Sequence, residues 1–417
     1  MRQQIEGSRA VAQTVALCRP EVVCAYPITP QTHIVEGLGE LVKSGALSPC
    51  EFINVESEFG ALSVAIGSSA AGARTYTATA SQGLLFMAEA VYNASGLGLP
   101  IVMTIGNRAI GAPINIWNDH SDSMSMRDAG WIQLHAETNQ EAADLHIQAF
   151  RLAEELSCPV MVCMDGFILT HAYESVDLPT QEQVDAYLPP FEPRQLLDPK
   201  HPMSIGAMVG PEAFTEVRYL SHHKQLCALD RIPVLNREFC AQFGRNSGGL
   251  LRTYHSEHAK TVVVALGSVN GTIQEVVDQM REEGHSIGSI SICSYRPFPQ
   301  AVVQEALESA ERVVVVEKSL AVGLGGILTG DIQVATAGSV NELYTVIAGL
   351  GGRVITQQSL RDVFLKAEAD ELEQVTFLDL NQDIIERHLV RESKQRLSGP
   401  AAENILRDIN SIAGRIG

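Results

Sequence analysis

Short apolar runs alternate with longer segments of helical spacing along most of the chain. An apolar run of strand length followed by an amphipathic segment is typical of parallel sheets covered by helices on both faces. The alternation therefore predicts an α/β fold. In the first part of the chain, the predicted strands are Val22–Tyr26, Phe52–Val55, Thr75–Thr79, Ile101–Ile105 and Val160–Met164.

The segments between these strands differ in composition. Residues 60–72 are rich in alanine, glycine and serine, which permits close approach to a sheet or to a neighbouring subunit. Residues 10–18 have the spacing of an amphipathic helix and are too short and too polar for an export signal. Between residues 178 and 252 the pattern loosens, and we expect irregular excursions and a linker there. The prolines that interrupt it are Pro189, Pro190, Pro193, Pro199 and Pro211.

A second alternation begins at Thr261 and predicts a separate α/β domain. Its predicted strands are Val262–Leu266, Ile290–Cys293, Arg312–Glu317 and Leu343–Ile347. Its predicted helices are Thr272–Glu283, Ala301–Ala310 and a segment near Gly326–Ala335. The tail beyond it is charged and helical by propensity, and we assign it no chemistry. The chain is therefore expected to divide into residues 1–252, 258–375 and 376–417.

Composition narrows the class of protein. A formal net charge of −19 over 417 residues argues against nucleic acid or an anionic membrane surface as a partner. The apolar runs are strand-sized, so we expect no transmembrane helix and a cytoplasmic location. The eight cysteines are scattered without any Cys-x-x-Cys, which excludes the usual bacterial iron–sulfur spacing from this chain. If electrons leave this protein, another subunit must carry them.

The first candidate for chemistry is the turn Tyr26-Pro27-Ile28-Thr29-Pro30-Gln31-Thr32, which follows a predicted strand. The two prolines fix φ near −65° and bias the preceding residues away from helix, so the turn is stiff before any ligand arrives. Strand exits are where open α/β sheets bind ligands. The turn presents the hydroxyl of Thr29 at such an exit. A simpler alternative is that Thr29 is an ordinary helix N-cap.

Two further strand exits carry charged side chains. Glu56 and Glu58 stand at the start of the helix that follows the second strand, and Arg108 follows the fourth. Three exits thus supply a hydroxyl, a carboxylate and a guanidinium. Simpler alternatives are open for each charge. Acidic residues at a helix start stabilise it by about 0.3–1 kcal/mol each, and an arginine here could form a salt bridge at an interface.

These motifs occur in the order and spacing of a known family. Together with Thr79-Ala80-Ser81-Gln82-Gly83, Asn107-Arg108-Ala109 and Pro113-Ile114-Asn115-Ile116, they make the chain resemble the alpha subunit of the 2-oxoacid:ferredoxin oxidoreductases over residues 1–375. This is the pyruvate synthase group, and the phenylglyoxylate oxidoreductase alpha subunit is similar too. The resemblance implies a doubly wound parallel sheet of the pyrimidine-binding thiamine-diphosphate type. A smaller α/β domain like the transketolase C-terminal domain is expected to follow it.

The resemblance also implies roles for residues. A carboxyl that hydrogen-bonds N1′ of the aminopyrimidine activates thiamine diphosphate, and Glu58 matches the glutamate of the family motif. Arg108 and Thr29 match residues that bind the substrate, and a guanidinium can hold a 2-oxo acid carboxylate through two parallel hydrogen bonds. Residues near the cofactor are expected to include Pro27, Ile28, Ser81 and Gln82. Asn107, Asn115, Asp119 and Asp122 are expected to shape the loop or to meet a neighbouring subunit.

The family's partner motif is absent from the sequence. Thiamine enzymes hold the diphosphate through a metal bound by Gly-Asp-Gly and a later Asn, and the near matches at Asp165-Gly166 and Gly330-Asp331 do not complete it. A beta subunit is therefore expected to carry Mg²⁺ and the diphosphate. Gamma and delta-type subunits are expected to bring the coenzyme A site and iron–sulfur clusters, with a flavoprotein where NAD is the acceptor. The glycines Gly323, Gly325 and Gly326 favour a turn and helix start over a phosphate loop.

We weighed three functions. The first is decarboxylation of a 2-oxo acid with formation of acyl-CoA and CO₂, the electrons passing through iron–sulfur subunits to ferredoxin or NAD. The second is the beta component of a lipoamide-linked 2-oxo acid dehydrogenase, and the third a scaffold that has lost the chemistry. Pyruvate is the default substrate, while branched-chain acids, indolepyruvate and phenylglyoxylate stay open. Phe59 and the stretch Ile116-Trp117-Asn118 are candidate specificity positions.

Overall fold

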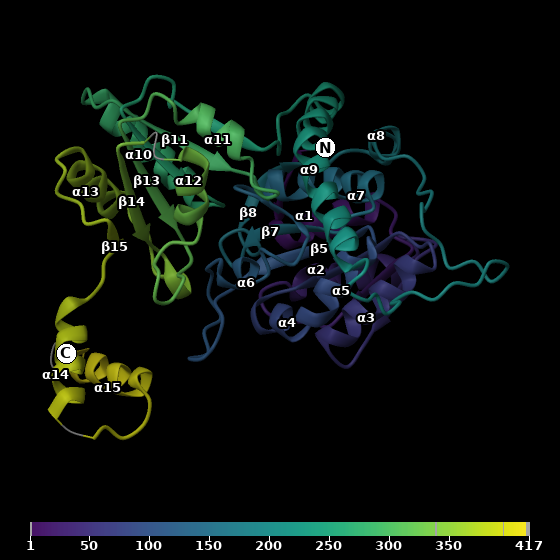
Figure 1. Ribbon diagram of the computed structural model, residues 1–417, viewed down its shortest axis with the longest axis horizontal. Coiled ribbons are helices and arrows are strands. Elements are labelled where there is room, and N and C mark those ends of the chain that lie inside the picture. The colour runs from purple at the N-terminus through teal and green to yellow at the C-terminus, as the bar shows by residue number, and fades with distance from the viewer. Residues whose placement is uncertain (1, 338–339, 395, 414–417) are drawn as a thin grey trace.

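The chain builds two large sheets and a separate pair of C-terminal helices (Figure 1). The computed structural model describes residues 2–337, 340–394 and 396–413. In this part of the chain the first sheet has seven strands in the order β12-β6-β7-β5-β4-β2-β3. They are β2 (Val22–Ala25), β3 (Glu51–Asn54), β4 (Thr75–Thr79), β5 (Ile101–Asn107), β6 (Ile132–His135), β7 (Val160–Asp165) and β12 (Ser294–Arg296). Every strand predicted here is present.

Helices cover both faces of this sheet, because alternate side chains along each strand point to opposite sides. Val23 and Ala25 of β2 pack in one core, and Cys24 between them packs in the other. The first core is shared with α1 (Gly7–Leu17), α2 (Thr32–Lys43) and α7 (Asn139–Leu156). The second is shared with α3 (Glu58–Ala70), α4 (Ser81–Phe86) and α5 (Ala88–Leu97). The amphipathic helix expected at residues 10–18 is α1.

The strand order reverses between β2 and β4. From β2 the chain moves to β3 on one side and then crosses to β4 on the other, with all these strands parallel. Such a switch point leaves a crevice outside the carboxyl ends of the strands, where open α/β sheets bind ligands. The Tyr26–Thr32 turn and Ser81 lie directly after these two strands.

The interpretation of residues 178–252 as irregular is only partly right. Residues 188–213 have no helix or strand, but α8 (Gln181–Tyr187) and the long α9 (Phe214–Phe243) lie on either side of them. The stripe of Ala228, Ile232, Leu235 and Phe239 buries α9 against the first core. Most of the remaining face is exposed, and Pro233 stands inside the helix. Because of the narrow buried stripe and the internal proline, the apolar residues of α9 do not show a clear helical periodicity in the sequence.

Several short elements were not predicted from the hydrophobic pattern. β1 (Arg2–Glu6) pairs with β8 (Tyr173–Asp177) in a small antiparallel sheet, and α6 (Ser121–Ser125) follows the loop after β5. β6 was not predicted because its sequence, Ile-Gln-Leu-His, contains two polar residues. Both are buried: Gln133 donates a hydrogen bond to the carbonyl of Ser123, and His135 packs edge-on against Tyr295.

The second sheet has six strands among the described residues, in the order β15-β14-β13-β10-β11-β9. They are β9 (Leu251–Tyr254), β10 (Thr261–Ala265), β11 (Ile287–Ile292), β13 (Arg312–Glu317), β14 (Glu342–Ile347) and β15 (Val375–Phe377). Helices α10 (Val269–Glu282) and α13 (Gln357–Glu368) cover one face, and α11 (Gln300–Ala306) and α12 (Leu328–Thr336) cover the other. The predicted strands of this part are all present.

A strand from the second half of the chain, β12, joins the two sheets in addition to the linker between them. β12 comes from the second half of the sequence but pairs antiparallel with β6 of the first sheet. Next to it, the amide of His135 donates to the carbonyl of Cys293 over 2.8 Å. A crossing strand fixes the carboxyl edge of one sheet relative to the other.

The glycines after β13 form a turn and a helix start, as the sequence favoured. Glu317 is buried, and its carboxylate accepts hydrogen bonds from the amides of Ile327, Leu328 and Thr329 at 2.7, 2.9 and 3.2 Å. These are the free N–H groups that a phosphate would otherwise use. The chain's own carboxylate therefore occupies the start of α12.

The tail folds into α14 (Gln382–Lys394) and α15 (Ala401–Ala413), which lie away from both sheets (Figure 1). Arg391 of α14 pairs with Asp408 of α15 over 2.8 Å. Within the described residues, none of the helices has both the length and the apolar character needed to cross a membrane.

Candidate active site at the carboxyl edge of the first sheet

A buried residue to which the sequence analysis gave no role, Gln31, holds the Tyr26–Thr32 turn by hydrogen bonds. Gln31 is fully buried, its amide donates to the carbonyl of Ile28 over 2.9 Å, and its side chain donates to the carbonyl of Tyr26 over 3.0 Å. Gln31 is also the N-cap of α2, so the alternative that Thr29 caps this helix is wrong. Thr29 is exposed at the tip of the turn, with Pro27 and Ile28 before it.

Glu58 is the first residue of α3, where the hydroxyl of Ser57 caps the amide of Gly60 over 3.1 Å. Its side chain turns inward: Glu58 is only 9% exposed, while Glu56 is exposed. Gly83 makes room for it, because a Cβ at that position would lie 2.8 Å from Oε1 of Glu58. In the described part of the chain, the Glu58 carboxyl has no hydrogen bond and no ion pair, so its oxygens are available to a ligand.

The exit of β4 is fastened to the loop that follows β5. The amide of Ser81 donates to Asp122 over 2.9 Å, and its hydroxyl lies within hydrogen-bonding distance of both the carbonyl of Ala109 and the side-chain oxygen of Gln82. The amide end of Gln82 lies against Gly111, where a Cβ would be 2.6 Å away. These two predicted cofactor residues therefore connect the start of α4 to the arginine loop.

Asp122 is the centre of that loop. It is fully buried and accepts from the amides of Ser81, Arg108 and Ser123 and from the side chain of Asn107, at 2.8 to 3.0 Å. Burial raises the pKa of Asp122 to about 6, although these four donors act in the opposite direction. The expectation that Asp122 shapes the loop is confirmed.

Arg108 leaves β5 and turns toward the Thr29 turn. Its Nη1 donates to the carbonyl of Thr29 over 3.0 Å, and its Nε donates to the carbonyl of Asn115 over 2.9 Å. Burial lowers the pKa of Arg108, and the Asp122 carboxylate opposes part of this shift. Across the described residues no carboxylate lies within ion-pairing distance of its guanidinium. Arg108 is 8% exposed. Its guanidinium is therefore a buried positive charge without an acidic partner among these residues.

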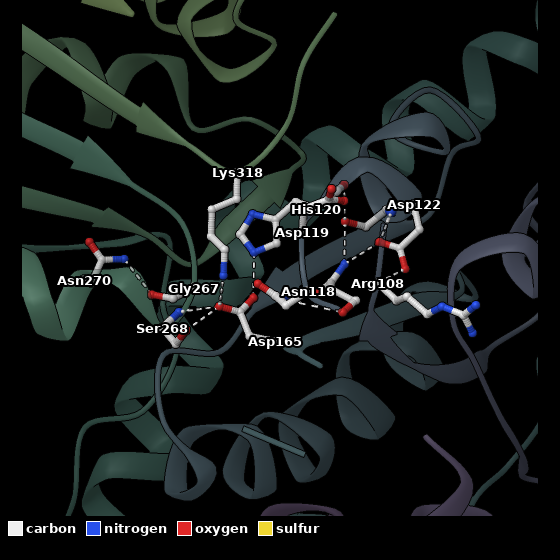
Figure 2. A network of polar contacts seen from close by, with 12 residues as sticks. Arg108, Asn118, Asp119, His120, Asp122, Asp165, Gly267, Ser268, Asn270 and Lys318 are labelled. Carbon is white, nitrogen blue, oxygen red and sulfur yellow. Dashed lines mark hydrogen bonds and ion pairs between the residues drawn. The ribbon is translucent and has the colours of Figure 1, made fainter. Parts of the chain in front are cut away.

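A second buried network holds this loop against the other sheet (Figure 2). Asp165, at the end of β7, accepts from Nε2 of His120 over 2.6 Å and from Nζ of Lys318 over 3.1 Å. The amide of Ser268 donates to it over 3.1 Å, and the Ser268 hydroxyl donates as well. Burial raises the pKa of Asp165, but the charges of Lys318 and His120 outweigh it and hold the pKa well below its usual range.

The position of this network follows from the topology. Ser268 and Lys318 stand after β10 and β13, where the strand order of the second sheet reverses. The switch point of the second sheet is therefore filled by a carboxylate of the first. Next to it lies a cavity of about 290 Å³, lined by Asn118, Ser268 and Lys318 among others.

Both near matches to the diphosphate motif are engaged within the chain. Asp165 is surrounded by the donors just described, and Asp331 pairs with Arg296 over 3.1 Å and accepts from the hydroxyl of Tyr295 over 2.8 Å. Both carboxylates thus have partners within this chain. A larger cavity of about 910 Å³ lies elsewhere, between α9 and the segment after β12, and no predicted site residue lines it.

Sequence reasoning assigned no role at the site to Gln31, Gly83, His120, Asp165 or Lys318, although it noted Asp165 as an incomplete diphosphate motif. A signal existed for two of them, because Asp165 and Lys318 directly follow predicted strands. Polar residues at the ends of parallel strands gather at one edge of a sheet. Nothing in the sequence showed that two separate sheet edges face each other.

Comparison with known proteins identifies the family of the chain. Residues 13–233 match the family described as pyruvate flavodoxin/ferredoxin oxidoreductase, thiamine diphosphate-binding, and residues 259–360 match core domain II of pyruvate:ferredoxin oxidoreductase. The chain belongs to the pyruvate:ferredoxin oxidoreductase family. It is an alpha-type subunit of the 2-oxoacid:ferredoxin oxidoreductases, which confirms the resemblance drawn from the motifs.

Several relatives match over nearly their whole length. Pyruvate synthase subunit PorA of Methanosarcina barkeri is 44% identical, with 91% of this chain and 97% of that protein covered. The PorA of Methanothermobacter thermautotrophicus is 42% identical, with 91% and 98% covered. Ketoisovalerate oxidoreductase subunit VorA of Pyrococcus horikoshii is 38% identical, with 90% and 94% covered.

Two solved structures share the fold. A 2-oxoglutarate:ferredoxin oxidoreductase from Magnetococcus marinus superposes with a TM-score of 0.67 and 18% identity, covering 88% of this chain and 65% of that one. A split-gene transketolase superposes with a TM-score of 0.53 and 14% identity, covering 89% and 100%. The expected α/β fold of the thiamine-diphosphate type is confirmed.

Proposed function

We propose that this chain is the alpha subunit of a multi-subunit enzyme that decarboxylates pyruvate and forms acyl-CoA and CO₂, with electrons passing to ferredoxin or NAD. One observation carries the assignment to these residues. Glu58 and Arg108 are buried side chains that form no ion pair within the described residues, and both face the switch-point edge of the first sheet. A substrate carboxylate and a cofactor ring nitrogen are the partners that such groups lack.

Thiamine diphosphate fits the residues at this edge. Glu58 is the acid that would share a proton with N1′ of the aminopyrimidine, and Gly83 keeps the space beside its carboxyl open. Pro27, Ile28, Ser81 and Gln82 belong to the two strand exits that would line the ring. When bound, the cofactor supplies the carbon nucleophile that attacks the keto carbon and takes up the electrons left when CO₂ departs.

The side chains of this subunit then orient the substrate. Arg108 donates two N–H groups to the substrate carboxylate, while its hydrogen bond to the Thr29 carbonyl keeps the guanidinium beside the turn. The Thr29 hydroxyl, exposed at the tip, donates to the same substrate. Asp122 and Gln31 touch no reacting atom; they position the loop and the turn that carry these groups.

The site is completed by partners. The two aspartates of the near-match motifs are already engaged, which supports a beta subunit that carries Mg²⁺ and the diphosphate half of the cofactor. Exposed apolar side chains on this edge suit such an interface, among them Tyr26, Phe59, Phe86, Ile114 and Trp117. The remaining partners in the proposal are gamma and delta-type subunits, which carry the coenzyme A site and the iron–sulfur clusters, and a flavoprotein where NAD is the acceptor. The complex is proposed to be cytoplasmic.

The units proposed within this chain are residues 1–252, 258–375 and 376–417.

The test of substrate is a panel of 2-oxo acids on the purified complex, following acyl-CoA formation with ferredoxin and with NAD. We expect pyruvate to give the highest kcat/KM. A preference for 2-oxoisovalerate, indolepyruvate or phenylglyoxylate would contradict pyruvate as the substrate. Transfer of the acyl group to lipoamide in place of coenzyme A would contradict the reaction class.

A second expectation concerns the chain by itself. The isolated subunit should be catalytically silent and should bind thiamine diphosphate only weakly, because the groups that hold the metal and diphosphate lie on the partner. Titration calorimetry with and without Mg²⁺ measures this directly. Micromolar binding that needs Mg²⁺ but no partner would overturn the sharing of the cofactor between subunits.

A further inference from the structure

Three potential metal ligands from distant parts of the chain meet beside the substrate turn. Glu6 ends β1, His33 lies in the first turn of α2, and His171 lies in the turn between β7 and β8. One ligand atom from each lies within 4.8 Å of the other two. No step of the proposed reaction uses any of these side chains.

The backbone around this group is tightly fixed. β1 pairs with β8, so that Glu6 stands opposite Tyr173. The following amides continue the contact: Gly7 donates to the carbonyl of Ala172 over 3.0 Å, and Ser8 donates to the carbonyl of Thr170 over 2.9 Å. These bonds hold Glu6 and His171 on two segments that cannot move apart independently. Rigid placement of ligands is what a metal site requires.

The side chains are oriented as ligands usually are. Nδ1 of His171 lies 2.7 Å from the hydroxyl of Thr170, and its ring packs against Phe167 with centroids 4.7 Å apart. A hydrogen bond to one ring nitrogen commonly fixes the orientation of a histidine ligand. Nδ1 of His33 lies 2.6 Å from Oε1 of Glu6, and Glu6 is only 8% exposed.

Other histidine–acid pairs in the described residues lack the third ligand. His285 and Glu368 show the same 2.6 Å separation, and His255 and Asp278 lie 3.5 Å apart. Across the residues that the structure describes, the group at Glu6 is the one that brings together three metal-ligating side chains. An ordinary ion pair accounts for the contact of His33 with Glu6, and the His171 ring stacks on that of His33 with centroids 4.8 Å apart. Together these contacts bring a second imidazole to the same carboxylate, which the other pairs lack.

We propose that Glu6, His33 and His171 bind one divalent transition-metal ion of the zinc class. Two imidazoles and one carboxylate form a known three-ligand set for Zn²⁺, with water at the remaining position. Binding replaces the hydrogen bond between His33 and Glu6 by two metal–ligand bonds, and the proton of that hydrogen bond moves to the other ring nitrogen of His33 or to solvent. The ion ties β1 and the β7–β8 turn to α2, the helix that begins directly after the substrate turn.

The test is a titration of the full chain, stripped with a chelator, with Zn²⁺ against a chromogenic competitor and with Co²⁺ followed by visible absorption. We expect one ion per chain above the background of other sites. His33→Gln and His171→Gln should each weaken this binding by about 100-fold or more, since even the loss of a residue that only supports a ligand costs 10- to 100-fold. Mg²⁺ should not compete, because it prefers oxygen ligands.

His285→Gln is the matched control, because it breaks an equivalent histidine–glutamate pair without a third ligand. This variant should bind Zn²⁺ like the wild type. Melting curves give a second readout: Zn²⁺ should raise the Tm of the wild type and of His285→Gln but not that of His171→Gln. If His171→Gln is poorly folded, Glu6→Gln serves in its place. Equal binding by wild type and ligand variants, or no binding by the wild type, overturns the site.

Discussion

Glu58→Gln should lower the activity of the assembled complex by a factor of about 100 or more. Glutamine has almost the same shape as glutamate, but it cannot exchange a proton with the ring nitrogen of the cofactor. The carboxyl is buried at the start of α3, has room beside Gly83, and makes no hydrogen bond or ion pair in the described chain. Removing its charge therefore breaks no internal contact, and the complex should still assemble.

The matched control for this variant is Glu56→Gln. Glu56 lies two residues earlier and is exposed. Both acids lie near the start of α3, so helix-dipole stabilisation would make the two substitutions equally mild. Steady-state rates at saturating substrate separate the alternatives. Similar losses in the two variants, whether large or small, would remove Glu58 from the reaction.

Much of the fold could be predicted because its strands are buried on both faces. A run such as Arg312–Glu317 reads as continuous apolar sequence in a covered parallel sheet, and its predicted bounds match those of β13. β6 was not predicted for the opposite reason, since its buried Gln133 and His135 are polar residues inside the core, where Gln133 donates to the carbonyl of Ser123 and His135 packs against Tyr295. Polar residues inside a core carry no periodic signal.

The long helix α9 shows a second limit. Its buried stripe is narrow, from Ala228 to Phe239, and the prolines before it favour irregular structure. A helix that packs along one thin line on an already formed core gains its stability from tertiary contacts more than from its own sequence. The pattern of residues 214–243 alone therefore favoured a linker.

The meeting of the candidate site residues at one edge was predictable in part, because topology brings strand exits together. Thr29, Ser81 and Arg108 follow three parallel strands, and parallel strands place their carboxyl ends at one edge. The network around Asp165 could not be predicted in the same way. It depends on how the second sheet faces the first, which is fixed by β12 and by burial that no local pattern encodes.

Arg108→Lys should lower kcat/KM for the 2-oxo acid by about ten- to a few hundred-fold, with little change in the Tm of the complex. Lysine keeps the charge but loses the planar pair of N–H groups, so the exchange is not conservative at a carboxylate site. A charge-assisted hydrogen bond contributes roughly 1.5–3 kcal/mol, which corresponds to that loss of rate. Arg108 has no acidic partner within the described chain, so the cost in stability is limited to its hydrogen bonds with the carbonyls of Thr29 and Asn115.

Arg74→Lys is the control that shows what a structural arginine does. Arg74 is buried like Arg108, but its guanidinium pairs with both carboxylate oxygens of Glu154, at 2.6 and 2.9 Å. Its replacement should lower the Tm and leave kcat/KM nearly unchanged, because Arg74 is remote from the switch-point edge. If Arg108→Lys behaves like Arg74→Lys, with a lowered melting temperature and an unaltered kcat/KM, then Arg108 is a structural or interface contact and the substrate carboxylate is bound elsewhere.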